Sequence, residues 1–319
     1  MNETNIDQTR AGFVAIIGAP NAGKSTLVNA LVGEKVSIVT HKVQTTRFQI
    51  RGIAMIDNTQ LVLVDTPGIF NPKDRLSRSM VHAAWTGVDD ADAIIHVVDA
   101  PAAWRALNNS DDTSQDRLAL EDTKRVLEGL KLRQRGQSYL ALNKIDTIDR
   151  EHLLSLIAHF NDSEIYKDVF LISALKQDGV TELGQKLCEV MTPGPYLYPP
   201  DQAADIPMRL MAAEITREKL YLRLHDELPY ASMVETEKWT DKKDGSVRVD
   251  QVVYVKRKSQ KPIVLGKGGQ TIKQIGAQAR HEMQEWLGRR VHLFLFVKVR
   301  EKWADDPARY LPQGLEFDV

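Results

Sequence analysis

The chain has 319 residues, of which 43% are hydrophobic and 27% are charged, as in ordinary globular proteins and unlike disordered ones. Its single cysteine, Cys188, excludes an internal disulfide and a metal site built from several cysteines. The net charge of −1 hides a basic segment, because residues 256–300 hold 11 Lys and Arg against two acidic residues, which predicts a polyanion partner. The polar N-terminus and the lack of any run of about 18 apolar residues predict neither a signal peptide nor a membrane span.

Residues 1–192 alternate strand-like apolar runs with helical patterns. The runs are FVAIIG at 13–18, QLVLVD at 60–65, AIIHVVD at 93–99, SYLALNK at 138–144 and VFLIS at 169–173. This alternation predicts an α/β domain with a mostly parallel sheet covered by helices on both faces, and ligands bind at the carboxyl ends of such strands. Residues 101–115 are expected to form a polar surface segment. The proline-rich residues 193–202 predict a linker to a smaller domain, residues 203–319.

A phosphate-binding loop is predicted after the first strand, where residues 18–25, GAPNAGKS, spell the pattern GxxxxGKS. Glycines in such a loop let backbone NH groups and the next helix N-terminus face the phosphates. Lys24 adds a positive charge, and the Ser25 hydroxyl is a candidate ligand for Mg²⁺. The candidate nucleotide-binding residues of this stretch are Gly18, Ala19, Pro20, Asn21, Ala22, Gly23, Lys24, Ser25 and Thr26.

Three further motifs follow later strands. In DTPG, Asp65 is a candidate for the magnesium shell, and the Gly68 NH can contact a terminal phosphate. In NKID, the Asp146 carboxylate can accept two hydrogens from the N1 and N2 edge of guanine. Taken singly, such an aspartate is more often a solvated loop residue, but its place in an ordered set of motifs at strand ends favours the guanine contact. In SAL, a backbone NH can donate to guanine O6. The candidate residues of these motifs are Asp65, Thr66, Pro67, Gly68, Ile69, Asn143, Lys144, Asp146, Ser173, Ala174 and Leu175.

Together with QTTR at residues 44–47, these motifs resemble the translation-factor class of GTPases, and the Era branch in particular. The resemblance implies binding of GTP and GDP with Mg²⁺, a catalytic set of Lys24, Thr46 and Gly68, and Thr46, rather than its neighbour Thr45, as the switch residue on Mg²⁺. Asn21 is either a K⁺ ligand or a turn residue. Ile69 stands where Ras-like GTPases carry a water-orienting glutamine, which predicts slow hydrolysis that a partner accelerates. Residues 40–43, THKV, lack the proline expected in switch I.

The C-terminal domain is predicted to run helix, two strands, two helices and strand, the order of a type II KH domain, which is an α+β fold. Its GKGG loop, at residues 266–269, stands where that family clamps a nucleic-acid backbone. The alternative is a glycine-rich turn that only closes a helix. The candidate RNA-binding residues are Gly266, Lys267, Gly268, Gly269 and Lys273.

A GTPase domain followed by a type II KH domain is the arrangement of the Era branch. The resemblance implies a monomer that binds the 3′ end of small-subunit ribosomal RNA and acts in assembly and maturation of the small ribosomal subunit. It also implies a cytoplasmic protein with peripheral contact at the inner face of the cytoplasmic membrane. Two alternatives are an RNA-binding adaptor with a static GTP site and a GTPase that acts mainly on a membrane or cell-cycle partner.

Overall fold

The computed structural model describes residues 9–133, 137–225 and 227–319, which form two compact units. The first unit comprises the described residues up to Ser37 together with Thr46–Asp205 and Gly314–Val319. The second comprises Ile38–Thr45 and Ile206–Gln313. The expected lack of a signal peptide concerns residues 1–8, which lie outside the described residues. Within the described ranges, no helix is both long enough and apolar enough to cross a membrane.

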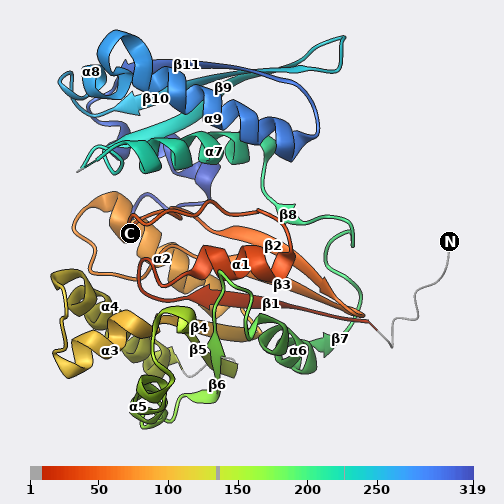
Figure 1. Ribbon diagram of the computed structural model, residues 1–319. Helices are drawn as coiled ribbons and strands as arrows, with labels where there is room; N and C mark the ends of the chain where they lie inside the picture. Colours follow the sequence, from red (N-terminus) through yellow and green to blue (C-terminus); the bar gives the residue numbers. More distant parts are fainter. Residues whose placement is uncertain (1–8, 134–136, 226) are drawn as a thin grey trace. The chain divides into compact units, whose positions relative to one another are not determined.

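The first unit is built on one twisted sheet with the strand order β6-β5-β4-β1-β3-β2-β8 (Figure 1). All five predicted strands are present, and β1, β3, β4, β5 and β6 run parallel to one another. The short strand β7 pairs with β1. The strands are β1 (Arg10–Ile17), β2 (Ile50–Ile56), β3 (Thr59–Asp65), β4 (Ala93–Asp99), β5 (Gln137–Asn143), β6 (Tyr166–Ile172), β7 (Thr192–Pro193) and β8 (Ala204–Asp205).

Helices cover both faces of this sheet, as predicted, because alternate residues of the central strands are apolar and fully buried on either side. Helices α1 and α6 pack on one face, and α2, α3, α4 and α5 pack on the other. The half-buried Cys188 packs against the first of these cores. The helices are α1 (Lys24–Val32), α2 (Arg75–Asp89), α3 (Ala100–Asn108), α4 (Ser114–Arg133), η2 (Ile145–Thr147), α5 (Arg150–Asn161) and α6 (Val180–Val190).

Two sequence expectations about the first unit need correction. Residues 101–115 are not a polar surface segment, because most of them form α3 and the start of α4, and the first turn of α3 is buried. The Asp99 carboxylate accepts a hydrogen bond from the Ala102 NH and so starts α3, with Pro101 in its first turn. The antiparallel strand β2, at the edge of the parallel set, has no counterpart in the prediction.

The second unit has the element order predicted for a KH domain. Its sheet has the order β11-β10-β9, with β10 parallel to β11 and antiparallel to β9. Helices α7 and α9 pack on the inner face, where fully buried Val253, Ile275 and Leu220 meet. The elements are α7 (Met208–Arg223), β9 (Ser232–Asp241), β10 (Val247–Val255), α8 (Gln260–Leu265), η3 (Lys267–Gly269), α9 (Gln270–Leu287), β11 (Val291–Val299), η4 (Trp303–Asp305), η5 (Pro307–Arg309) and η6 (Leu311–Gln313).

Candidate nucleotide site and candidate RNA-binding loop

The predicted phosphate loop connects β1 to α1, at the carboxyl edge of the sheet. Its backbone turns through left-handed conformations at Asn21 (φ 63°) and Gly23 (φ 99°), and α1 begins directly afterwards at Lys24. Gly23 is required for space as well, because a Cβ there would lie 2.2 Å from Asn143 Nδ2. This geometry directs the first NH groups of α1 toward an anion at the helix N-terminus. Thr26 follows, half-buried, in the first turn of α1.

Lys24 is buried beneath this loop. Its Nζ donates to the carbonyl oxygens of Gly18 at 3.2 Å and of Ala19 at 2.8 Å. Burial lowers the pKa of Lys24 to about 8, although the nearby Asp65 carboxylate partly opposes the shift. A phosphate would strongly stabilise this buried ammonium, because its negative charge compensates for the lost hydration, whereas the loop carbonyls carry no net charge.

Ser25, Thr46 and Asp65 meet at one point, although they come from α1, the switch segment and the end of β3. The Ser25 hydroxyl donates to Asp65 Oδ2 at 2.7 Å and lies 2.8 Å from the Thr46 hydroxyl. Thr46 in turn donates to the same carboxylate oxygen at 3.3 Å. Two hydroxyls and a carboxylate are the hard oxygen ligands that Mg²⁺ prefers.

Asp65 itself shows that these residues fit a cation. Its side chain is fully buried, and burial raises its pKa against the opposing effect of the Ser25 hydrogen bond. Within the described part of the chain, its Oδ1 atom accepts no hydrogen bond of normal geometry. A buried carboxylate oxygen without a donor is costly, and a bound divalent cation would remove that cost.

The DTPG turn lies against the phosphate loop. The Thr66 hydroxyl donates to the Ile16 carbonyl at 2.8 Å, and the Ile69 NH donates to the Gly18 carbonyl at 3.1 Å. Pro67 and Gly68 are buried between these two anchors, and Gly68 packs against Pro20. The Ile69 side chain is 2% exposed and belongs to the core, so it places no polar group near an attacking water.

Asn143 joins two of the predicted loops. Its Nδ2 donates to the Ala22 carbonyl at 2.8 Å, and its Oδ1 accepts from the Ala174 NH at 2.9 Å. The amide therefore braces the phosphate loop against the SAL loop. The Ala174 NH, one of the SAL-loop NH groups that the sequence offers as donors to guanine O6, is therefore already engaged by this brace.

Asp146 lies beside Ser173, whose hydroxyl donates to Asp146 Oδ1 at 2.6 Å and so orients the carboxylate. Lys144 adopts a left-handed backbone (φ 68°) and forms an ion pair with Asp99. Leu175 is 75% exposed at the outer end of the SAL loop. The NKID and SAL loops, which are distant in the sequence, thus meet at the Asp146 carboxylate.

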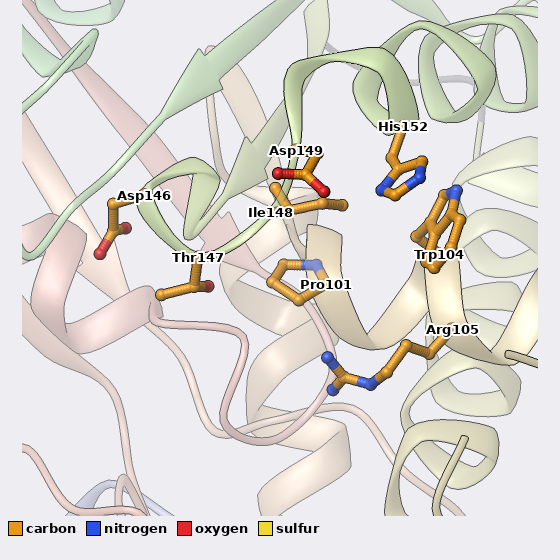
Figure 2. A pocket seen from close by; sticks show the side chains of 8 residues that line it. All are labelled: Pro101, Trp104, Arg105, Asp146, Thr147, Ile148, Asp149 and His152. Carbon is orange, nitrogen blue, oxygen red and sulfur yellow. The ribbon is translucent and has the colours of Figure 1, made fainter. Parts of the chain in front are cut away.

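A pocket of about 350 Å³ extends from Asp146 and Thr147 toward α3 and α5 (Figure 2). Pro101 lies between its two ends, and the stacked rings of Trp104 and His152, 3.7 Å apart, lie at the end away from Asp146. Sequence reasoning missed these residues. The signal in the sequence that could have found them is Asp99 followed by Pro101, a pattern typical of a helix start. It predicts the helix α3, whose residues line the pocket, in place of the expected surface segment.

The GKGG loop of the second unit lies in the open. It precedes the 18-residue helix α9, and all three glycines have positive φ angles of 59–77°. A Cβ at Gly268 or Gly269 would meet nothing within 4 Å. Lys267 and Lys273 are exposed, and so is Ile263 of α8, which sequence reasoning did not single out. The loop therefore presents NH groups, a helix N-terminus and two ammonium groups to solvent, which suits a phosphate backbone.

Comparisons with known proteins cover both units. A family model described as a 50S ribosome-binding GTPase matches residues 13–144, and a KH-domain model matches residues 227–304. A GTPase Era from Caulobacter vibrioides is 55% identical over 312 residues, or 98% of each chain. A GTPase Era from Brucella suis is 56% identical over 315 residues, which are 99% of this chain and 96% of the relative.

Solved structures give a similar result. The crystal structure of Era in complex with MgGDPNP and nucleotides 1506–1542 of 16S ribosomal RNA has a TM-score of 0.84 and 34% identity. It covers 96% of this chain and 99% of its own. An Aquifex aeolicus Era variant bound to GDP·AlF4⁻ matches with the same TM-score, identity and coverage.

Proposed function

The chain belongs to the GTPase Era family, and on that premise we propose that it binds the 3′ end of small-subunit ribosomal RNA and acts in assembly of the small subunit. As a member of this family it is a GTPase, which hydrolyses GTP to GDP and phosphate. The observation that carries the RNA proposal is the structural match to Era holding 16S RNA, combined with an exposed, basic GKGG loop in the second unit.

Nucleotide binding follows from the first unit. We propose that Lys24 and the NH groups at the start of α1 bind the phosphates, and that Asp146 reads guanine. Ser25, Thr46 and Asp65 would hold Mg²⁺, which when bound neutralises charge on the outer phosphates. The Gly68 NH would contact the terminal phosphate. Asn143 contributes by holding the phosphate loop and the SAL loop at a constant separation.

Hydrolysis is expected to be slow, because the buried Ile69 cannot orient water. We propose that a bound partner completes the site. We also keep Asn21 as a proposed K⁺ ligand, since its left-handed backbone at the tip of the loop turns the chain beside the phosphates.

RNA binding is assigned to residues 266–269 with Lys273. The matching GTPase model carries a description that refers to the large subunit, but it covers only residues 13–144 and leaves out the GKGG loop. The structural match that includes both units concerns small-subunit RNA, so our proposal follows it. We further propose the domain limits 1–192, 193–202 and 203–319, a monomer, and a cytoplasmic location with peripheral contact at the inner membrane face.

Crosslinking of the full chain to RNA in cells tests this function. We expect crosslinks from residues 266–273 to concentrate in the 3′ end of small-subunit ribosomal RNA. Single-turnover GTP hydrolysis, measured with and without that RNA, should show acceleration. Crosslinks confined to other RNAs would contradict the proposed target. A hydrolysis rate that does not change when RNA binds would favour an adaptor with a static nucleotide.

A further inference from the structure

Helix α7 carries a buried polar face that the proposed function does not use. Glu214, Arg217, Glu218 and Tyr221 have the spacing i, i+3, i+4 and i+7, which places them on one side of the helix. All four are at most 4% exposed. Charged side chains are rarely buried this completely unless each has a specific partner.

The partners of this face include residues 38–45, which belong to the same unit and overlap the predicted switch stretches at 40–43 and 44–47. Arg217 donates through Nη1 to the Gln44 carbonyl at 3.4 Å and through Nη2 to the Thr45 carbonyl. Glu218 accepts from the Val39 NH at 2.9 Å. One face of α7 thus holds both ends of an eight-residue segment.

Arg217 is itself held by Glu214, which accepts from its Nε at 2.7 Å and also from its Nη2. A guanidinium is a planar fork of five donors, so one edge can pair with a carboxylate while the outer donors reach two carbonyl oxygens. Burial alone would lower the pKa of Arg217, but attraction to Glu214 outweighs burial and raises it, so the side chain stays charged. An apolar residue would fill this space without fixing a backbone.

The fixed backbone leads directly into the candidate magnesium site. Thr45, whose carbonyl Arg217 holds, is joined by one peptide bond to Thr46, whose hydroxyl meets Ser25 and Asp65. Gln44 has a left-handed backbone (φ 56°), a strained conformation for a non-glycine residue that surrounding contacts must maintain. Restraint at residues 44 and 45 therefore limits where the Thr46 hydroxyl can lie.

We propose that Arg217, oriented by Glu214, is a positioning residue for GTP hydrolysis that acts from the second unit through the backbone of residues 44 and 45 on Thr46. This inference rests on the proposed role of Thr46. It implies that a ligand of the second unit that displaces α7 changes the hydrolysis rate without touching the nucleotide.

The test replaces the ion pair as a whole. Removal of Arg217 alone would leave a buried, unpaired carboxylate and destabilise the fold, whereas apolar replacement of both partners is often neutral. We therefore choose the full-length double variant Arg217→Met with Glu214→Leu. The matched control is Arg248→Met with Asp250→Leu, which removes another ion pair between an arginine and a carboxylate, in β10.

We expect the double variant to keep the melting temperature of the wild type, because both partners of the ion pair are replaced together. Its GDP affinity should also be unchanged, because GDP contacts are proposed only in the first unit. Its kcat should fall roughly ten- to a hundredfold, as expected when a reacting group is misplaced by about 1 Å. The Mg²⁺ concentration for half-maximal hydrolysis should rise, and KM for GTP should change little. The β10 control should keep the wild-type kcat.

Further variants separate the possible failures. Arg217→Lys keeps the positive charge beside Glu214 but loses the planar guanidinium, so it should show the same fall in kcat with a wild-type melting temperature. If the double variant has a lowered melting temperature, Arg217→Lys provides the test instead. Wild-type kcat and Mg²⁺ dependence in Arg217→Lys or in a stable double variant would overturn the inference while leaving the proposed site intact. A Thr46→Val variant with wild-type kcat and Mg²⁺ dependence would overturn both the inference and the proposed role of Thr46.

Discussion

The two glycine-rich loops of this molecule use similar residues in opposite environments. GAPNAGKS and GKGG each place glycines and a lysine at the start of a helix, so each offers NH groups and a positive charge to phosphate. Lys24 of the first loop is buried, and Gly23 is pressed against Asn143. Lys267 of the second loop is exposed, and Gly269 has open space around its Cα. The enclosed first loop therefore suits a compact polyphosphate, and the open second loop suits a long nucleic-acid backbone.

The difference teaches that a glycine-lysine motif predicts phosphate contact but leaves selectivity to its surroundings. In the first unit, Asn143 at the end of β5 braces the phosphate loop, and we propose that Asp146, in the loop after β5, limits which base fits. The backbone hydrogen bonds of the GKGG loop are local, from the Gly266 NH to the Pro262 carbonyl at 2.9 Å and from the Gly269 NH to the Gly266 carbonyl at 3.1 Å. We therefore expect single substitutions to reduce ligand affinity strongly at the first loop and only moderately at the second.

The largest expected effect concerns base selection, which only the enclosed site provides. Asp146→Asn places an amide donor against the guanine donors, so preference should shift from GTP to xanthosine triphosphate by at least about a thousandfold. Competition binding with the two nucleotides measures this shift. Ser173→Ala, which loses the hydrogen bond that orients Asp146 and the one that the Ser173 hydroxyl accepts from the Lys176 NH, is the matched control and should keep GTP preferred. Retained GTP preference in Asp146→Asn would mean that another group reads the base.

A pair of glycine substitutions compares the two loops directly. Gly23→Ala and Gly269→Ala both force alanine into a left-handed backbone, but only the first also pushes a Cβ into Asn143. Loss of that brace should weaken GDP binding by about 3 kcal/mol, or roughly a hundredfold. Titration with a fluorescent GDP analogue should show the loss in Gly23→Ala and not in Gly269→Ala. Equal GDP affinity in the two variants would contradict the importance of the brace.

The open loop should respond more moderately. Lys267→Glu is expected to weaken binding of the RNA 3′ end roughly tenfold and to reduce the salt slope of binding by about one. Lys243→Glu, in the exposed β9–β10 turn, is the matched charge control. RNA binding across a salt series, measured beside basal GTP turnover, tests this expectation. Normal RNA affinity in Lys267→Glu would reduce GKGG to a helix-closing turn.

The buried environment of Lys24 predicts a dependence on pH that an exposed lysine lacks. Without nucleotide its pKa is about 8, so above that pH it loses a proton that phosphate binding must restore. GDP affinity should therefore be insensitive to Lys24 below pH 8 and fall by up to about tenfold per pH unit above it. The unfolded chain holds this proton up to about pH 10.4, so the nucleotide-free fold should gain stability over the same window. Lys24→Met should remove both trends, which titration calorimetry and melting from pH 7 to 10 will show.

The smallest expected effect is that of the monovalent cation. If Asn21 helps hold K⁺ where charge develops, hydrolysis should be several-fold faster in K⁺ than in Na⁺ at equal ionic strength, roughly the scale of one added electrostatic contact. Asn21→Gly keeps the left-handed backbone and removes the side chain, so it should abolish the difference. Identical wild-type rates in the two salts would leave Asn21 a turn residue.

Much of this molecule was readable from local patterns alone. The five parallel strands, the order of the KH elements and the loops at residues 18–25 and 266–269 each depend on hydrophobic periodicity or on glycine, which act within a few residues. The sequence by itself also determined that Ile69, and no glutamine, follows the DTPG motif. The resemblance to a GTPase joined to a KH domain rested on these same short stretches, and the comparisons confirm it.

Only the tertiary structure decided which distant residues meet. Asn143 became a brace because β5 ends beside both the phosphate loop and the SAL loop, and Lys24 acquired its lowered pKa from complete burial. The buried polar face of α7 lies against residues 38–45, although no pattern in either stretch predicts contact with the other. The physical reason is that periodicity reports whether a side chain is buried, whereas its partner depends on strand order and on packing across more than a hundred residues of chain.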